Sequence, residues 1–406
     1  MTVAHSHPLG SGTGPITLPP RPIREVETQF LKTGRPFALT EGKEIKDLTI
    51  AYETYGTLNE ARDNAVLLFH AFSGSQHAAG INRHVPGLTV DWSESLQIGW
   101  WDDFIGPGKA LDTDELFVVC ANMLGGCYGT TGPSSLAPRD DQESPDKERR
   151  YGSEFPWINA RDVVRSQALL LDELGIDSLR AVVGPSLGGI MALTFALEYP
   201  GRAKAIIPIA SSHVANSQQI AMNFHQQQAI VLDPHFRKGD YYGGTGPSNG
   251  MVLARQIAQM TFVDQSTLIE RAGSQMTNPV NHPSYRMFYP VESYLRNNAA
   301  KFVNRFDANS YLVMLGLWQG AKLLDLYQAP SFPDLFARCR ESRFTVIGID
   351  PDCCFPTSQQ EDLHQTLREG GIDSDLFIVS SRKGHDSFLL EPALYEQVLR
   401  EALVGR

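Results

Sequence analysis

The sequence lacks most of the features that mark membrane and secreted proteins. No stretch is both long and apolar enough to cross a bilayer. The five cysteines form no Cys-x-x-Cys motif, and their odd number does not suit a full set of disulfides. Residues 1–20 are rich in Gly, Pro, Ser, Thr and His and contain no apolar core like that of a secretory signal. These absences predict a cytoplasmic protein with reduced thiols and no membrane partner.

Basic residues and cofactor motifs are also scarce. The chain has 35 Lys and Arg against 46 Asp and Glu, and its net charge of −11 argues against a nucleic-acid partner. It has no Gly-x-Gly-x-x-Gly motif, no cluster with metal-ligand spacing, and no Gly-Lys-Ser/Thr ending to the glycine-rich loop 125–133. We therefore expect no bound metal or cofactor, and we interpret loop 125–133 as a wall of the active site.

The stretch Leu179–Pro200 does carry a chemical motif. A short apolar run leads into Gly184-Pro185-Ser186-Leu187-Gly188, and a segment of small residues with helical spacing follows. A Gly-x-Ser-x-Gly between a strand and a helix is typical of a nucleophile elbow. Side chains at 184 or 188 would crowd the helix or the strand, which explains the glycines. We predict that Ser186 is a nucleophile and that the Leu187 N–H faces a forming oxyanion.

A second copy of this pattern, Gly246-Pro247-Ser248-Asn249-Gly250, has a different context. It follows residues 241–245, which are typical of a loop, so the strand that positions an elbow is missing. We predict that Ser248 lies in a surface turn.

Apolar runs that are typical of buried parallel strands alternate with helical segments over much of the chain. The expected strands are 47–55, 65–70, 116–122, 179–184, 203–210, 344–349 and 376–379, and expected helices include 158–174 and 359–369. The alternation stops between 213 and 336, where the sequence predicts helices at 218–232, 251–260, 266–272, 291–302 and 309–326.

This order of elements predicts an α/β fold with a mostly parallel sheet and helices on both faces. We expect a mobile tail at 1–20, a core made of 21–212 and 337–406, and a helical insertion at 213–336. An insertion between two strands would form a lid over the serine. The same helices could form the interface of a homodimer.

An elbow serine needs a base and an orienting acid, which follow it in the order Asp, then His. Asp350 and Asp352 follow the strand 344–349, and His385 follows the last strand. Ser186 would attack a carbonyl, His385 would carry the proton, and one of the two aspartates would hold the imidazole. His70, after the strand 65–70, is the main competing histidine, and we expect it to shape the pocket. The Phe72 N–H in the same loop is the predicted second oxyanion donor.

Several blocks of the chain resemble the homoserine O-acetyltransferase family of α/β-hydrolase-fold proteins. The resemblance covers about residues 43–392, and its most specific blocks are 64–80, 99–113, 124–129, 305–312 and 384–386. It implies acetyl transfer from acetyl-CoA, as a co-substrate, to L-homoserine in methionine biosynthesis. The family's Asp-x-x-Phe-Pro motif matches Asp352 to Pro356 and so favours Asp352 over Asp350. The resemblance also implies that Arg255 binds the substrate carboxylate and that Asp386 binds its ammonium group.

Two places depart from the family pattern. The chain has Gln226-Gln227-Gln228 where the family has Gln-Arg-Gln, and it differs again at 312–320, after Tyr311. Both places lie in the helical insertion, so they leave the triad intact and leave the two substrates open. The alternatives are succinyl transfer, serine as the acceptor, or an esterase on the same scaffold.

Overall fold

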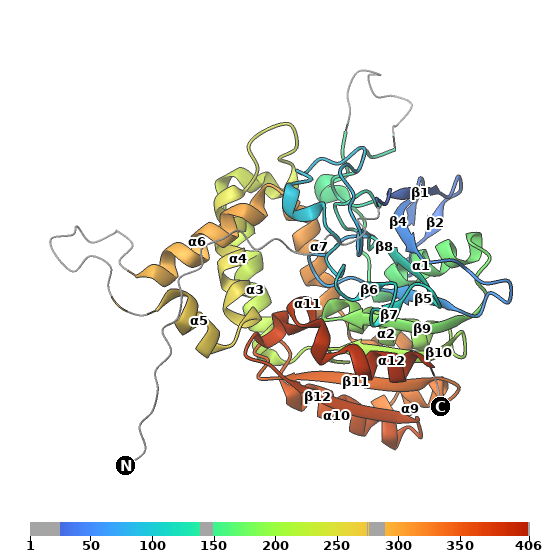
Figure 1. Ribbon diagram of the computed structural model, residues 1–406. Coiled ribbons are helices and arrows are strands. Elements are labelled where there is room, and N and C mark those ends of the chain that lie inside the picture. Colours follow the sequence, from blue (N-terminus) through green and yellow to red (C-terminus); the bar gives the residue numbers. More distant parts are fainter. Residues whose placement is uncertain (1–24, 139–148, 274, 276–288, 405–406) are drawn as a thin grey trace, which may run out of the picture.

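The computed structural model describes residues 25–138, 149–273, 275 and 289–404. The tail expected at 1–20 therefore lies outside the described residues. An eight-stranded sheet in the order β1-β4-β8-β5-β9-β10-β11-β12 forms the centre of the molecule (Figure 1). Its strands are β1 (Gln29–Lys32), β4 (Thr49–Tyr55), β5 (Ala65–Leu68), β8 (Phe117–Ala121), β9 (Leu179–Pro185), β10 (Ala203–Ile209), β11 (Arg343–Asp350) and β12 (Ser374–Ser380).

The sheet is mostly parallel, as predicted. Strands β8, β5, β9, β10, β11 and β12 pair in parallel, whereas β1 pairs antiparallel with β4 and β4 antiparallel with β8. Two short ribbons, β2 (Phe37–Ala38) with β3 (Glu44–Ile45) and β6 (Ile105–Gly106) with β7 (Leu111–Asp112), lie outside it. The parallel pairing places the carboxyl ends of β5, β9, β11 and β12 at one edge, where polar side chains can meet.

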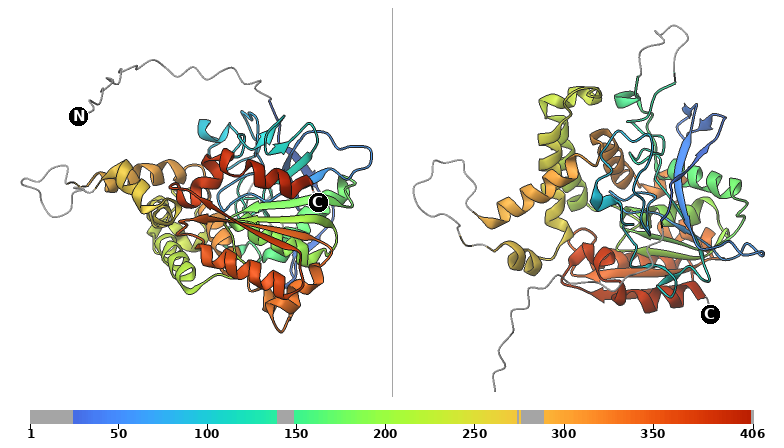
Figure 2. Two further views of the ribbon diagram at one scale, coloured as in Figure 1. Left: turned by 60° about the horizontal axis from the view of Figure 1, so that its bottom comes forward. Right: turned by 45° about the horizontal axis from the view of Figure 1, so that its top comes forward.

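Helices cover both faces of the sheet (Figure 2). On one face α1 (Ala160–Glu173), α2 (Leu187–Glu198) and α10 (Thr357–Glu369) bury apolar side chains against the strands. On the other face α12 (Glu396–Val404) packs on a second core that includes Trp101 and Phe104. Because both faces are buried, the central strands are continuous apolar runs.

The segment between β10 and β11 is helical. It contains α3 (Ser217–Val231), α4 (Ser248–Phe262), α5 (Gln265–Ala272), α6 (Pro290–Val303), α7 (Ala308–Gln319), α8 (Leu323–Tyr327) and α9 (Phe332–Phe336). In Figure 1 helices α3 to α6 gather at one side of the sheet. Among the described helices, none has the length and the apolar character needed to cross a membrane.

Two sequence-based expectations in this segment were wrong in detail. The helix expected at 309–326 is two helices, because α7 is capped by Gly320, a poor helix former, before α8 begins. Ser248 is exposed, as expected, but it is the first residue of α4 rather than part of a surface turn. Pro247 precedes it with a fixed φ of −77°, which suits the start of a helix.

Candidate active site

Ser186 lies at the sharp turn between β9 and α2. Its backbone has φ 56° and ψ −125°, a conformation that is uncommon for a residue with a side chain. A Cβ atom at Gly184 would lie 2.0 Å from the Gly188 carbonyl oxygen, and one at Gly188 would lie 2.4 Å from the Phe69 carbonyl oxygen. Both distances are much shorter than a van der Waals contact, so a side chain at either position would clash. The expectation that the glycines avoid crowding of helix and strand is confirmed.

Ser186, His385 and Asp352 form a chain of hydrogen bonds. The distance from His385 Nε2 to Ser186 Oγ is 2.9 Å, and that from His385 Nδ1 to Asp352 Oδ2 is 2.7 Å. The backbone N–H groups of Cys354 and Phe355 donate to Asp352 Oδ1 at 2.7 and 2.8 Å. The side chains of Ser186, His385 and Asp352 are all buried. The aspartate in contact with His385 is thus Asp352 and not its exposed neighbour two residues earlier.

The surroundings of His385 favour its protonated form. Burial alone would lower the pKa of His385, but the Asp352 carboxylate outweighs it, so the pKa lies well above its usual range. Phe355 stacks on the ring with centroids 5.5 Å apart, and Phe388 meets it edge-on at 5.2 Å. These contacts and the Asp352 hydrogen bond fix the imidazole so that Nε2 faces Ser186.

Two backbone N–H groups near Ser186 are unpartnered. Within the described chain, neither Phe72 N–H nor Leu187 N–H donates to any protein group. Leu187 is the first residue of α2, where the helix dipole favours negative charge. Phe72 lines the same cavity as Ser186. Both groups are therefore available to an oxyanion, and their role as its donors stays a prediction.

The His70 ring has no hydrogen bond to Ser186. Its Nδ1 donates to the Ala71 carbonyl at 2.7 Å, and its Nε2 accepts from the Met123 N–H at 3.0 Å. Burial lowers the pKa of His70 to about 4, so the ring is neutral. Both ring nitrogens have structural partners, and the side chain supports the loop that carries Phe72.

A cavity opens above Ser186 and His385, and the predicted substrate residues line it. Arg255 from α4 and Asp386, next to His385, both face this cavity. No ion pair joins the two side chains, although each feels the charge of the other. Other lining residues are Asn223, Gln226, Tyr311, Trp318, Cys353 and Cys354.

Arg255 and Asp386 are poorly solvated. Arg255 lies over two aromatic rings, 4.3 Å from the Phe302 centroid and 4.8 Å from that of Phe262, and its Nε has no hydrogen-bond partner. Burial lowers the pKa of Arg255 and raises that of Asp386. Two opposite charges that line one cavity without forming an ion pair suit a ligand that carries both a carboxylate and an ammonium group.

The glycine-rich loop 125–133 is not a wall of this cavity, contrary to our expectation, because none of its residues lines it. Instead the Tyr128 hydroxyl donates to the Arg305 carbonyl at 2.7 Å, and its ring meets that of Phe306 edge-on. A Cβ at Gly125 would lie 2.6 Å from the Val313 side chain. The loop therefore packs against the helical segment at Arg305, Phe306 and Val313.

Only one of the two departures from the family pattern reaches the cavity. Gln227 is exposed on α3, whereas Gln226 faces inward and accepts a hydrogen bond from the Tyr311 hydroxyl at 2.5 Å. Trp318 lines the cavity and stacks on Phe355 with centroids 4.9 Å apart. The sequence analysis did not identify Trp318 as a cavity residue. Helical spacing from Tyr311, seven residues earlier, could have done so.

The residues described here contain no group of three or more His, Cys, Asp or Glu side chains that could hold a metal ion. The groups in place for catalysis are the Ser186 hydroxyl, the His385 imidazole bonded to it, and the N–H groups of Phe72 and Leu187.

A serine at a strand–turn–helix elbow, bonded to a histidine and an aspartate from later strands, defines an α/β-hydrolase-fold protein. A family model described as alpha/beta hydrolase fold matches residues 64–392. A homoserine O-acetyltransferase of Symbiobacterium thermophilum is 40% identical over 390 residues, which cover 95% of this chain and 97% of that protein. One from Moorella thermoacetica is 39% identical and covers 90% and 93%. The chain belongs to the homoserine O-acetyltransferase family.

Two solved structures extend the comparison. The crystal structure of homoserine O-acetyltransferase from Bacillus anthracis has a TM-score of 0.81 and 26% identity, and covers 95% of this chain and 99% of its own. The crystal structure of esterase E22 has a TM-score of 0.80 and 28% identity, and covers 93% and 100%. The fold alone therefore does not separate a transferase from an esterase.

Proposed function

We propose that this protein transfers an acetyl group from acetyl-CoA to the hydroxyl of L-homoserine, giving O-acetyl-L-homoserine and CoA. The observation that carries the proposal is that the Ser186–His385–Asp352 chain opens into a cavity with two unpaired, opposite charges, Arg255 and Asp386. The family relationship supports the same reaction, which supplies a precursor for methionine biosynthesis.

The first half-reaction acylates the serine. Ser186 Oγ attacks the thioester carbonyl while His385 Nε2 takes its proton, and Asp352 stabilises the resulting imidazolium. The N–H groups of Phe72 and Leu187 hold the negative oxygen of the tetrahedral intermediate. When the intermediate collapses, the C–S bond breaks and His385 returns the proton to the CoA sulfur. The products are acetyl-Ser186 and free CoA.

The second half-reaction transfers the acetyl group to homoserine. His385 takes the proton of the substrate hydroxyl, whose oxygen attacks the acetyl carbonyl, and the same two N–H groups hold the oxyanion. Collapse breaks the bond to Ser186 Oγ, which regains a proton from His385. Arg255 binds the homoserine carboxylate and Asp386 its ammonium group, so the acceptor hydroxyl is presented to the acyl-enzyme.

Hydrolysis is the second candidate, and the similarity to esterase E22 is the observation that favours it. The two reactions differ in whether water or the amino acid reaches acetyl-Ser186. A charge pair suited to a zwitterion favours the amino acid. Succinyl transfer and serine as the acceptor use the same catalytic groups, and the cavity lining does not distinguish them.

The oligomeric state and the cellular location are the last two parts of the proposal. We propose a homodimer formed through the helical insertion, where apolar side chains of α3 and α4 are exposed. The five cysteines are all free thiols, which suits a cytoplasmic location.

The test of the proposed function is mass spectrometry of the intact protein after treatment with acetyl-CoA. One added acetyl group, mapped by peptide analysis to Ser186 and absent from Ser186→Ala, is the expected result. A matrix assay of acetyl-, propionyl- and succinyl-CoA against homoserine, serine and no acceptor then follows thiol release. If the acyl-enzyme turns over as fast without an acceptor as with homoserine, the protein is a hydrolase.

A further inference from the structure

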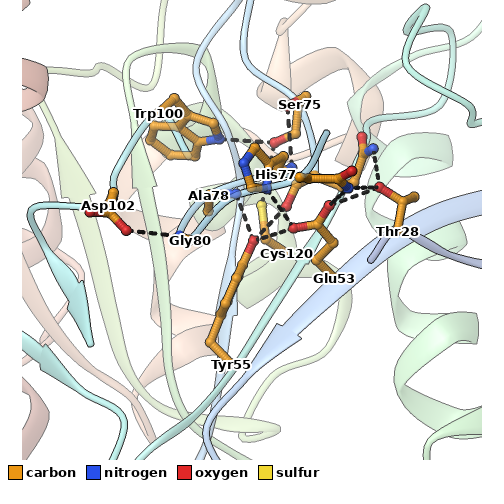
Figure 3. Close-up of polar contacts among 12 residues, drawn as sticks. Thr28, Glu53, Tyr55, Ser75, His77, Ala78, Gly80, Trp100, Asp102 and Cys120 are labelled. Atoms are coloured by element: carbon orange, nitrogen blue, oxygen red, sulfur yellow. Dashed lines mark hydrogen bonds and ion pairs between the residues drawn. The ribbon is translucent and has the colours of Figure 1, made fainter. Parts of the chain in front are cut away.

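A buried polar cluster around the Glu53 carboxylate (Figure 3) lies next in sequence to residues 70–74. These residues carry the Phe72 N–H and are called the oxyanion loop. Glu53 on β4 is 1% exposed. Its Oε1 accepts from Thr28 Oγ1 at 2.8 Å and from Asn82 Nδ2 at 2.9 Å, and its Oε2 accepts from the Tyr55 hydroxyl and His77 Nδ1, both at 2.8 Å. Burial alone would raise the pKa of Glu53, but these donors and the charge of His77 lower it. Glu53 is therefore ionised.

The partners of His77 require it to carry a positive charge. Its Nδ1 faces the Glu53 carboxylate, and its Nε2 faces the Gln97 carbonyl at 3.0 Å. A carboxylate and a carbonyl can only accept hydrogen bonds, so both ring nitrogens must donate, as they do only in the imidazolium. His77 is 1% exposed, and the ring of Trp92 covers it with centroids 5.9 Å apart. Glu53 and His77 thus form a buried ion pair.

This ion pair lies within a set of bonds that fix the backbone at 75–78. The Ala78 N–H donates to the Tyr55 hydroxyl at 2.7 Å, and Gln76 Nε2 donates to Thr28 Oγ1 at 2.9 Å. The Ser75 carbonyl accepts from the Trp100 indole at 2.9 Å and, more weakly, from the Cys120 thiol at 3.6 Å. Figure 3 shows Thr28, Tyr55 and His77 around the Glu53 carboxylate, and Trp100 reaching Ser75.

The fixed backbone continues directly from the loop that carries Phe72. At its start, His70 bonds to the Ala71 carbonyl and to the Met123 N–H. At its end, the Glu53 cluster holds residues 75–78. The short turn between them closes with the Gly74 N–H donating to the Ala71 carbonyl at 2.9 Å. Two anchors therefore determine where the Phe72 N–H points.

We propose that Glu53 and His77 are positioning residues for acyl transfer, which hold the oxyanion loop so that the Phe72 N–H meets the negative oxygen of each tetrahedral intermediate. The proposal rests on the proposed function and on the role given there to Phe72. Oxyanion donors act because they are already in place when charge develops. A loop held by an ion pair that water does not reach keeps that arrangement.

The test is Glu53→Gln, studied by rapid mixing with acetyl-CoA. The amide keeps the shape of the side chain but leaves the buried imidazolium without a counterion. The burst amplitude counts competent sites, and the rate constant reports transition-state stabilisation at each site. We expect the rate constants of acylation and of transfer to homoserine to fall together by roughly 10- to 100-fold, with an unchanged KM for homoserine. The double variant E53Q/H77Q, which removes both charges, should recover part of that loss.

A matched control is Glu198→Gln. This change breaks the ion pair of Glu198 with Arg161, whose Nε lies 2.8 Å from Glu198 Oε2 on the opposite face of the sheet. It should lower stability and leave the rate constant per competent site unchanged. If Glu53→Gln does not fold, Tyr55→Phe removes one of the four donors to Glu53 and should lower the rate constants about 3- to 10-fold. Wild-type rate constants per competent site in a folded Glu53→Gln or Tyr55→Phe variant would overturn the proposal.

The same variants should be mixed with p-nitrophenyl acetate, which needs an oxyanion hole whatever the natural acyl donor is. If wild-type protein forms acetyl-Ser186 from the ester but not from acetyl-CoA, the proposed function fails, and the ester burst still tests the positioning role. Equal ester rate constants in wild type and Glu53→Gln would contradict the positioning role alone.

Discussion

At the scale of single residues, the charge on Asp352 sets the pH at which His385 can act as a base. Acylation needs neutral His385, and Asp352 raises the pKa of that group above its usual value of about 6.5. The rate of acylation should therefore fall as the pH drops through this raised pKa. Asp352→Asn removes the carboxylate, so burial dominates and the acidic limb should move to lower pH. The maximal rate should fall by roughly 10⁴-fold, as in a serine-protease triad.

Measuring the burst rate constant from acetyl-CoA between pH 5 and 9 checks this prediction. Asp350→Asn is the matched control, because Asp350 is exposed and has no bond to His385. It should keep the wild-type profile. An unchanged acidic limb in Asp352→Asn would show that another group titrates there.

Arg255 should act only after the serine is acylated. Arg255→Ala is expected to leave the acetyl-CoA burst intact and to lower kcat/KM for homoserine by roughly 30- to 1,000-fold, the loss of one buried charge-assisted partner worth about 2–4 kcal/mol. Sequential rapid mixing separates the two steps. Arg305→Ala is the matched control, because Arg305 also lies over the Phe302 ring but does not line the cavity. A lost burst in Arg255→Ala would assign Arg255 to CoA binding or to the fold of the insertion.

The reacting residues could be predicted because their signals are local. The elbow at Ser186 has fixed glycines, and His385 follows a recognisable strand. Choosing Asp352 over Asp350 needed the family motif, since both follow β11. The Glu53–His77 pair could not be predicted. Three of the four donors to Glu53 are 24 to 29 residues away in the sequence, and a glutamate in an alternating strand is more often exposed.

At the scale of elements, α2 approaches the two residues that directly follow β5, and this α2–β5 contact ties the nucleophile to the loop that carries Phe72. A Cβ at Gly188 would lie 2.4 Å from the Phe69 carbonyl oxygen and 2.8 Å from that of His70. Gly188→Ala should push α2 from the end of β5, lower the free energy of unfolding by about 1–3 kcal/mol, and slow acylation. Denaturant unfolding and the acetyl-CoA burst measure the two effects.

Gly316→Ala is the control for this prediction. A Cβ there would lie 3.5 Å from Trp157, an ordinary contact, and alanine favours the helical backbone of α7. It should leave acylation unchanged and keep or slightly raise stability. Equal behaviour of the two alanine variants would contradict the role given to the α2–β5 contact.

The elements that could be predicted are those with strong apolar patterns. The buried parallel strands were each identified to within a few residues, because both faces of the sheet are covered. The short antiparallel strand β1 was missed, since its half-exposed four residues carry no clear period. Helix α12 was also missed, although the burial of Val398, Leu399, Ala402 and Leu403 follows a helical spacing that the sequence displays.

At the scale of the whole molecule, the helical insertion exposes an apolar surface that the core does not cover. Ile220 and Phe224 on α3 are 42% and 51% exposed, and Leu253 and Met260 on α4 are 50% and 60% exposed. The two helices pack against each other, so these side chains lie on adjoining elements. Exposed apolar surface of this kind is typical of a protein–protein interface, and a second copy of the insertion would cover it symmetrically.

Replacing Phe224 and Met260 with glutamate should therefore convert a dimer to a monomer, because two charges per subunit would be buried without partners. Sedimentation velocity at micromolar concentration measures the change. Leu394→Glu is the control, since Leu394 is 44% exposed beside α12, away from the insertion, and should leave the dimer intact. Wild-type protein that sediments as a monomer would rule out the dimer. Because Arg255, Ala258, Thr261 and Phe262 of α4 line the cavity, the monomeric variant should also bind homoserine more weakly than the wild type, with the Ser186 burst retained.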